Sequence, residues 1–176
     1  MIRLAGIALV AGAALSLTGC AGGVPPYESL APAVPGAAIR LEKGYSGNSI
    51  FTGASQTYLF SGVDYCDSLR VAAVLGAITS DMRTLRVPAG EAVVVTASTT
   101  FTTGRGNLGT VTDVCQNVSR FTPELGRVYS VKQTSRYGGR RCSLAIVDTE
   151  TGRPPADLER LNPAVVCPGD RGTGGL

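Results

Sequence analysis

Residues 91–103 read EAVVVTASTTFTT, in which every second residue suits a protein core and the intervening residues are mostly hydroxylated. The candidate core face carries Val93, Val95, Ala97, Thr99 and Phe101. The candidate solvent face carries Val94, Thr96, Ser98, Thr100 and Thr102. A period of two indicates a β-strand with one buried face, and similar segments recur about every ten residues between turns that contain Gly and Pro. The pattern predicts an all-β fold, either an antiparallel β-sandwich or a small barrel, with at most one short helix.

The turn residues predict how several strands connect. Leu85 and Val87 alternate with Arg86 before Pro88-Ala89-Gly90, which predicts a hairpin with the strand that follows. Further strands are expected at 110–121, 127–134 and 141–148, joined as a meander. Earlier strands are expected near 39–43, 56–60 and 69–77. The apolar run at 69–77 does not alternate, so a short buried helix is the alternative there, and 154–160 is expected to form one helical turn.

The first twenty residues have the organisation of a bacterial lipoprotein signal. Arg3 supplies a positive charge, residues 4–17 are uncharged and apolar, and Leu17-Thr18-Gly19-Cys20 has the order of a lipobox. The apolar stretch is shorter than the roughly 20 residues that a transmembrane helix needs. The chain therefore resembles a lipoprotein precursor, which implies that residues 1–19 are removed and that Cys20 is acylated. Ala21, rather than Asp, implies an anchor in the outer membrane that faces the periplasm.

The remaining organisation follows from composition. Residues 20–38 are rich in Pro, Gly and Ala, which predicts a tether reaching on the order of 55 Å. Residues 39–167 are expected to form one β-sandwich domain. The Gly-rich tail 168–176 is expected to be disordered.

Four cysteines remain besides Cys20, an even number that suits two disulfides in an oxidising compartment. The chain has no histidine and no C-x-x-C motif, which argues against a zinc site or a thioredoxin-like pair. Three pairings are open. We favour Cys115–Cys142 with Cys66–Cys167, because the alternatives tie Cys167 to a strand of the meander. The first bridge requires its two strands to converge across a sandwich or at a bulge.

Residues 85–96, a short strand, Pro-Ala-Gly and a valine-rich strand, resemble small extracytoplasmic sandwich domains of the transthyretin-like or PEGA-like kind. The resemblance covers about a third of the expected domain. It implies a β-sandwich outside the cytoplasm, and it implies no particular function.

One cluster of side chains is a candidate binding site. Arg136, Tyr137, Arg140 and Arg141 surround the Gly138-Gly139 turn, so three guanidinium groups and a phenol are expected at one hairpin tip. Guanidinium groups suit phosphate and carboxylate, so this tip is a candidate contact for an anionic envelope component or for a partner's acidic surface. A solvated turn is the alternative interpretation.

Other patterns argue against catalysis. There is no histidine to act as a base, no G-x-S-x-G motif, and only Lys43 and Lys132 for a Ser–Lys pair. The G-x-G-x-x-G match at 104–109 precedes a predicted strand rather than the helix that a dinucleotide site needs, so we interpret it as a hairpin loop. Asp64 with Asp67, and Asp148 with Glu150, are interpreted as surface turns. We expect no catalytic residues, no metal and no cofactor.

The functional expectation is a binding protein rather than an enzyme. The formal net charge of +3 does not indicate a nucleic-acid partner. We expect an accessory or scaffold lipoprotein of the cell envelope, held by its lipid and bound to an envelope protein. A periplasmic inhibitor or immunity lipoprotein is the alternative, and an envelope hydrolase is the third hypothesis.

Overall fold

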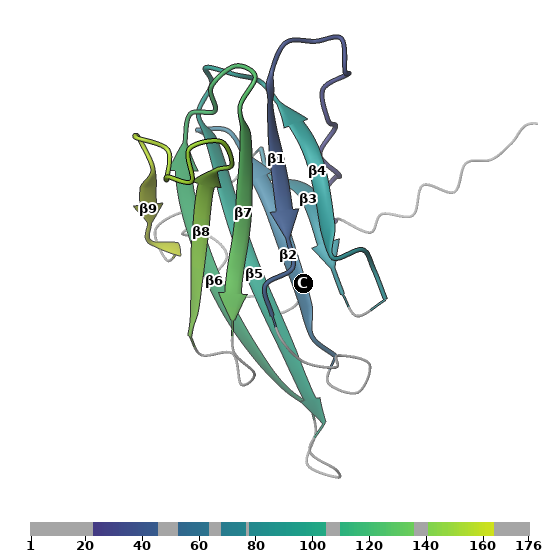
Figure 1. Cartoon of the computed structure of the whole chain (residues 1–176). Coiled ribbons are helices and arrows are strands. Elements are labelled where there is room, and N and C mark those ends of the chain that lie inside the picture. The colour runs from purple at the N-terminus through teal and green to yellow at the C-terminus, as the bar shows by residue number, and fades with distance from the viewer. Residues whose placement is uncertain are drawn as a thin grey trace, which may run out of the picture.

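The computed structural model describes residues 23–45, 53–63, 68–76, 78–104, 110–135 and 141–163. Within these ranges the chain forms nine strands and no helix. The strands are β1 (Ala37–Glu42), β2 (Ser55–Ser61), β3 (Arg70–Leu75), β4 (Met82–Val87), β5 (Val93–Gly104), β6 (Thr110–Phe121), β7 (Val128–Ser135), β8 (Cys142–Asp148) and β9 (Glu159–Leu161). They form two separate sheets that do not close into a barrel (Figure 1). The predicted all-β sandwich is confirmed, and the barrel alternative is wrong.

The sheets have the strand orders β4-β1-β7-β8 and β3-β2-β5-β6-β9. All named pairs are antiparallel except β1 with β7, where Ala38 lies opposite Val128 and Glu42 opposite Lys132. The expectation of a wholly antiparallel sandwich is therefore wrong at this pair. Parallel neighbours need a long connection, and the five strands β2 to β6 supply it here.

The chain crosses between the sheets at two places where hairpin connections were expected. β4 pairs with β1 whereas β5 pairs with β2, so Pro88-Ala89-Gly90 joins opposite sheets. β6 pairs with β5 whereas β7 pairs with β8, so the predicted meander is correct only for its last two strands. Alternation reports which face of a strand is buried but not the sheet to which the strand belongs, which explains both errors.

Within the predicted segment 69–77, Arg70–Leu75 forms strand β3 rather than the alternative helix. The register between β2 and β3 shifts beside Tyr58, and Ala72 and Ala73 are both buried. A bulge places two consecutive residues against one on the neighbouring strand, which explains why this apolar run does not alternate. Residues 154–160 form no helical turn and lead into β9, which pairs with β6.

The described part of the predicted tether, 20–38, packs on the domain instead of extending from it. The Val71 N–H donates to the Pro25 carbonyl at 2.8 Å, and the Tyr27 N–H donates to the Val71 carbonyl at 2.9 Å. The Tyr27 ring meets the Phe60 ring edge to face, with centroids 5.1 Å apart. Proline lacks a donor but keeps its acceptor, so a proline-rich segment still makes these bonds. β1 also begins inside the predicted tether.

The core lies between the sheets. Its largest fully buried side chains include Tyr58, Tyr129, Phe60, Phe121, Ile39 and Leu41. The predicted core face of β5 is confirmed, since every residue assigned to it is buried. The opposite face differs from expectation, because Val94 and Thr96 are only 1% and 5% exposed. Ser98 and Thr100 on that face are half-buried.

A disulfide joins Cys115 of β6 to Cys142 of β8, with Cα atoms 6.0 Å apart. The favoured pairing is confirmed for these two cysteines, and the bridge connects the two sheets because β6 and β8 belong to different ones. Cys66 and Cys167, the second predicted bridge, lie outside the described residues.

Buried hydrogen bonds also connect the sheets. Gln56 of β2, Thr99 of β5 and Gln133 of β7 are each 0% exposed. The Gln56 Nε2 donates to the Gln133 main-chain carbonyl at 2.8 Å, and the Thr99 Oγ1 lies 2.7 Å from the Gln133 Oε1. The Gln133 N–H donates to the Tyr58 hydroxyl at 3.0 Å, and burial raises the pKa of Tyr58 to about 12.

Candidate functional site

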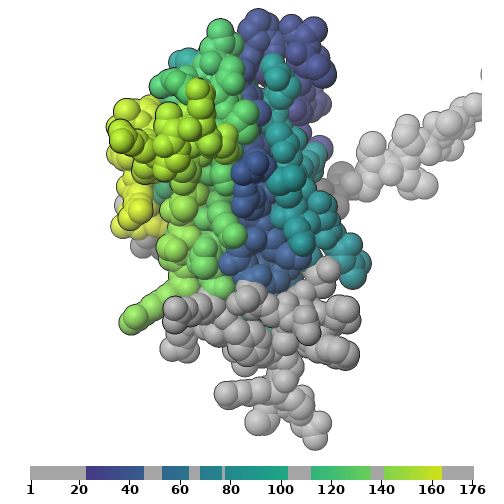
Figure 2. Space-filling view, viewed as in Figure 1, coloured from purple at the N-terminus to yellow at the C-terminus, as the bar shows by residue number. Residues whose placement is uncertain are grey.

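Turns from four parts of the chain gather at one end of the sandwich, which we call the hollowed end. The strand registers place 31–36, 88–92, 122–127 and 149–158 there, because Ala37 pairs with Val87, Val93 with Phe121, and Tyr129 with Asp148. Figure 2 shows these segments crowded together on the surface. Two hollows open between them.

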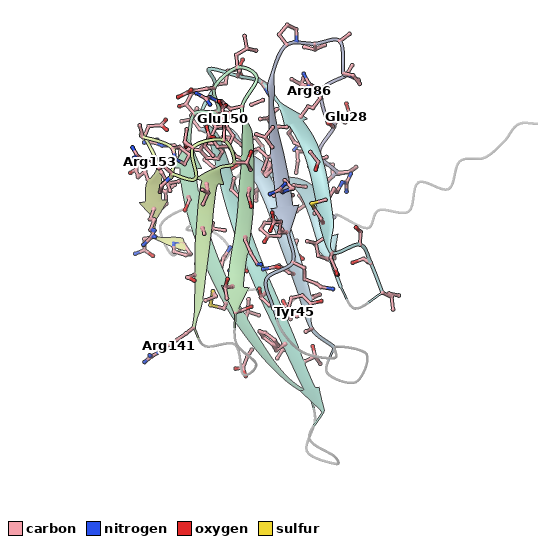
Figure 3. The ribbon with its side chains drawn as sticks, viewed as in Figure 1. Glu28, Tyr45, Arg86, Arg141, Glu150 and Arg153 are labelled. Atoms are coloured by element: carbon pink, nitrogen blue, oxygen red, sulfur yellow. A yellow bond between two sulfur atoms is a disulfide. The ribbon has the colours of Figure 1, made fainter. Side chains whose placement is uncertain are left out.

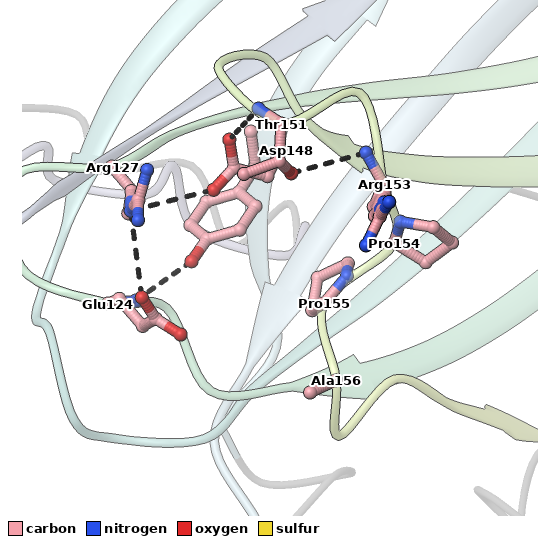
Figure 4. Close-up of a pocket in the computed structure, with 9 residues that line it drawn as sticks. Glu124, Arg127, Asp148, Thr151, Arg153, Pro154, Pro155 and Ala156 are labelled. Carbon is pink, nitrogen blue, oxygen red and sulfur yellow. Dashed lines mark hydrogen bonds and ion pairs between the residues drawn. The ribbon is translucent and has the colours of Figure 1, made fainter.

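The first hollow has a volume of about 390 Å³ (Figure 4). It is lined by Glu124, Arg127, Tyr129, Asp148, Thr151, Arg153, Pro154, Pro155 and Ala156. The second has a volume of about 450 Å³ and a mostly apolar lining. It is lined by Pro35, Ala89, Gly90, Thr122, Pro123, Glu124 and Leu125. Glu124 belongs to both, so the hollows lie on either side of one turn.

Main-chain hydrogen bonds fix these turns to one another. The Gly90 N–H donates to the Pro123 carbonyl at 2.9 Å, and the Gly126 N–H donates to the Gly36 carbonyl at 3.1 Å. Gly90 and Gly126 have φ angles of 79° and 75°, which glycine adopts without steric cost. The walls of both hollows are therefore held in place before any ligand arrives.

Asp148, at the end of β8, organises the first hollow. Its Oδ1 accepts from the Glu150 N–H at 2.8 Å and from the Thr151 N–H at 3.1 Å. Its Oδ2 lies 3.6 Å from the Arg127 Nε. The Thr151 N–H, together with the Glu150 N–H and the Arg127 charge, holds the pKa of Asp148 below its usual value. Asp148 is therefore an ionised structural acceptor at neutral pH.

Arg127 is surrounded by carboxylates. It pairs with Glu150, with Asp148, and with Glu124 at 3.6 Å from its Nε. The carboxylates of Glu150 and Asp148 raise the pKa of the guanidinium above its usual value. The Glu124 N–H donates to the Tyr129 hydroxyl at 3.0 Å, which ties this cluster to a buried ring. Arg127 is thus occupied by partners within the domain.

Arg153 differs from Arg127, because in the described part of the chain no carboxylate lies within salt-bridge distance of it. The Arg153 N–H donates to the Thr151 Oγ1 at 3.2 Å. Its main-chain carbonyl accepts from the Asp148 N–H at 2.9 Å, which fixes the backbone at this point. Pro154 and Pro155 form an apolar wall beside it (Figure 4). The hollow therefore offers an open guanidinium next to apolar surface, which suits an acidic side chain followed by an apolar one.

The residues proposed from the sequence lie elsewhere. Arg136, Tyr137 and Arg140 fall outside the described residues, as does Cys20. Arg141 is exposed at the start of β8, at the opposite end from Asp148 (Figure 3). Arg141 and the hollow around Asp148 are therefore at opposite ends of β8.

The sequence interpretation placed Asp148 and Glu150 on a surface turn. This is correct for Glu150, which is exposed on the turn after β8, but wrong for Asp148, which is the buried last residue of β8. The interpretation did not identify Arg127 or Arg153 as their neighbours. The spacing of Asp148 and Gly152, four residues apart, is a signal in the sequence that indicates a turn at this position. Asp commonly begins such a turn by accepting from main-chain N–H groups, and Gly152 has a φ angle of 68° in the structure.

Neither a metal site nor a membrane-spanning helix is found in the described chain. No group of three or more His, Cys, Asp or Glu residues within it is arranged to hold a metal ion. No helix within the described ranges is long and apolar enough to cross a membrane. No known family model matches the sequence, and no curated protein or solved structure is significantly similar to this chain.

Proposed function

We propose that this chain is a lipid-anchored accessory protein of the bacterial envelope, facing the periplasm, which binds a protein partner through the hollowed end. The observation that carries the proposal is the pair of hollows on either side of the 122–126 turn. Loops at the ends of sandwiches are common binding surfaces, because a rigid scaffold positions them.

The chemistry of this end supports a polypeptide partner. Interfaces combine an apolar centre with a polar rim, and arginine is enriched in them relative to the rest of a protein surface. Leu125 is 67% exposed beside the apolar second hollow, and Arg153 lies on the other side of the same turn. Prolines in both hollows restrict the backbone, so little conformational entropy is lost on binding.

The disulfide supports the proposed location. Disulfides persist in oxidising compartments such as the periplasm, and the Cys115–Cys142 bridge lies at a cross-sheet contact within the folded domain. The lipobox at residues 17–20 supplies the proposed route to that compartment.

Site-specific photo-crosslinking in living cells tests the proposal. A photoreactive residue in place of Ala156 or Leu125 should give an adduct with the same envelope protein, whereas one in place of exposed Ala145 on β8 should give none. Arg153→Glu should weaken the Ala156 adduct, and Arg141→Glu, the matched change at the other end of β8, should leave it intact. If Arg141→Glu weakens the adduct and Arg153→Glu does not, the binding surface is at the arginine tip around Arg141 instead.

Fractionation tests the anchor separately. Cys20→Ser should remove acylation and move the protein from the membrane to the soluble fraction. A Cys20→Ser protein that still sediments with the outer membrane contradicts the lipid anchor. A soluble periplasmic enzyme recovered as the sole cross-linked partner would identify the protein as an inhibitor instead.

A further inference from the structure

The chain is fixed to the domain close to its proposed lipid. Pro25 and Tyr27 bond to Val71 of β3, and further along the segment the Leu30 N–H donates to the Arg86 carbonyl of β4 at 3.1 Å. β3 and β4 are edge strands of different sheets. The segment therefore covers the open side of the sandwich between them, which we call the β3–β4 side.

Covalent geometry then limits the distance to the membrane. Five residue steps separate Cys20 from Pro25, and an extended chain spans at most about 3.6 Å per residue, or about 18 Å in total. This is a third of the reach expected for a tether that continues to residue 38. An acylated Cys20 therefore holds the β3–β4 side close to the lipid headgroups.

That side exposes apolar side chains that the fold does not use. Ile78, between the two strands, is 92% exposed, while Val74 of β3 and Met82 of β4 are 51% and 48% exposed. Figure 1 shows the connection between β3 and β4 projecting from this side. An isolated exposed apolar residue is ordinary, but these three all lie on the two edge strands that the short anchor segment bridges or on the connection between those strands.

The charges nearby are compatible with a bilayer. Arg70 and Arg83 are exposed on the same two strands. The acid nearest to Met82 in sequence, Asp81, is paired with Lys43. Glu28 is the remaining exposed acid of the segment that covers this side (Figure 3). Cations beside exposed apolar groups are typical of proteins that rest on membrane interfaces.

We propose that the β3–β4 side docks on the bilayer that holds the lipid anchor, with Ile78 inserted at the level of the headgroups. This rests on the proposed acylation of Cys20. Ile78 alone would bind lipid weakly, but a short anchor makes the contact intramolecular and raises its effective concentration. Docking fixes the orientation of the domain on the membrane.

The absence of tryptophan from the chain allows a direct test. The full-length acylated protein is reconstituted into phosphatidylethanolamine and phosphatidylglycerol vesicles that contain brominated lipid, as the variant Ile78→Trp or the variant Ala145→Trp. Ala145 is the matched control, because it is exposed on β8, at the opposite edge of the sheet from β4. We expect several-fold stronger quenching of the fluorescence of Ile78→Trp.

The outcomes separate the two proposals. Vesicle flotation and mass spectrometry first establish that the acyl group is present. If both variants float and are quenched equally, docking is overturned while the anchor stands. If Cys20 carries no acyl group and neither variant floats, the anchor and the docking both fall.

Discussion

The substitution Gln133→Leu tests whether the two sheets are held together by buried hydrogen bonds that act as one unit. The Gln133 side chain lies 2.7 Å from the Thr99 Oγ1 and donates to the Ala97 carbonyl at 2.9 Å. Gln56 and Thr99 are 0% exposed, so water does not replace a lost partner. Each orphaned buried polar group costs about 1–3 kcal/mol, and leucine regains part of this by apolar burial. We expect the free energy of unfolding to fall by about 3 kcal/mol.

A double-mutant cycle measured by urea unfolding, followed by circular dichroism, completes the test. Gln56→Leu alone removes the bonds of Gln56 to the Thr99 Oγ1 and to Gln133, and leaves the Gly44 N–H without its acceptor. Gln56→Leu with Gln133→Leu removes both amides together. The double variant should therefore be more stable than the sum of the single effects predicts, by more than about 1 kcal/mol. Lys132→Ala, the exposed neighbour on β7, is the control and should change stability by less than about 0.5 kcal/mol. Additivity within about 0.5 kcal/mol would refute the idea of a single unit.

Three further predictions concern the disulfide, Asp148 and the N-terminal segment. Replacing Cys115 and Cys142 together by alanine opens a loop with a sequence separation of 27. The chain-entropy model then predicts that the free energy of unfolding falls by about 3.5 kcal/mol. A decrease of less than about 1 kcal/mol in urea unfolding would contradict this prediction. The pKa of Asp148 is lowered in the folded state, so its ionised form stabilises the fold above the ordinary pKa of about 3.9, and this stabilisation is lost as the pH falls through the lower folded value. Asp148→Ala should therefore have a lower Tm than the parent protein at neutral pH and the same Tm in strong acid. If thermal melts show the same difference in Tm across this pH range, the ionised Asp148 carboxylate is not the source of the stabilisation. Tyr27→Ala should lower the free energy of unfolding by about 2 kcal/mol, because the ring packs on Phe60. Tyr27→Phe keeps the ring and is the control. If the segment were a free tether, neither change would alter the free energy of unfolding.

Period-two patterning predicted most of the strands and the core face of β5, but not the partners of the strands. β6 and β8 were expected near their observed positions, and the alternation of β5 identifies Val95 and Ala97 as core. The sheet to which β4 or β6 belongs depends on packing between segments far apart in the chain. Local pattern holds no information about that choice, so the hairpin at Pro88-Ala89-Gly90 was predicted where the chain changes sheets.

The same limit explains the tether and the candidate site. Residues 23–36 are poor in large apolar side chains, and their attachment depends on main-chain bonds to Val71 and on the single ring of Tyr27. Neither is visible in composition. The hollow near Asp148 requires Arg127 to approach from the turn before β7, and the β7–β8 register determines this approach. The Cys115–Cys142 bridge was favoured because the other pairings tie Cys167 to a strand of the meander. The distance limit on disulfides then required the two strands to converge, as β6 and β8 do across the two sheets.

The docked side and the binding hollow lie on different parts of the molecule, and this affects what the protein can reach. β4 and β3 are the edge strands on one side of the sandwich, and β8 and β9 are the edge strands on the opposite side. The hollow around Asp148 and Arg153 is built by the segment that joins β8 to β9, together with the turn before β7. A domain that rests on its β3–β4 side therefore turns Arg153 away from the lipid, toward proteins of the periplasm or toward neighbours in the same membrane. Because the chain from Cys20 to Pro25 spans only about 18 Å, any partner bound at the hollowed end must itself lie close to the membrane surface.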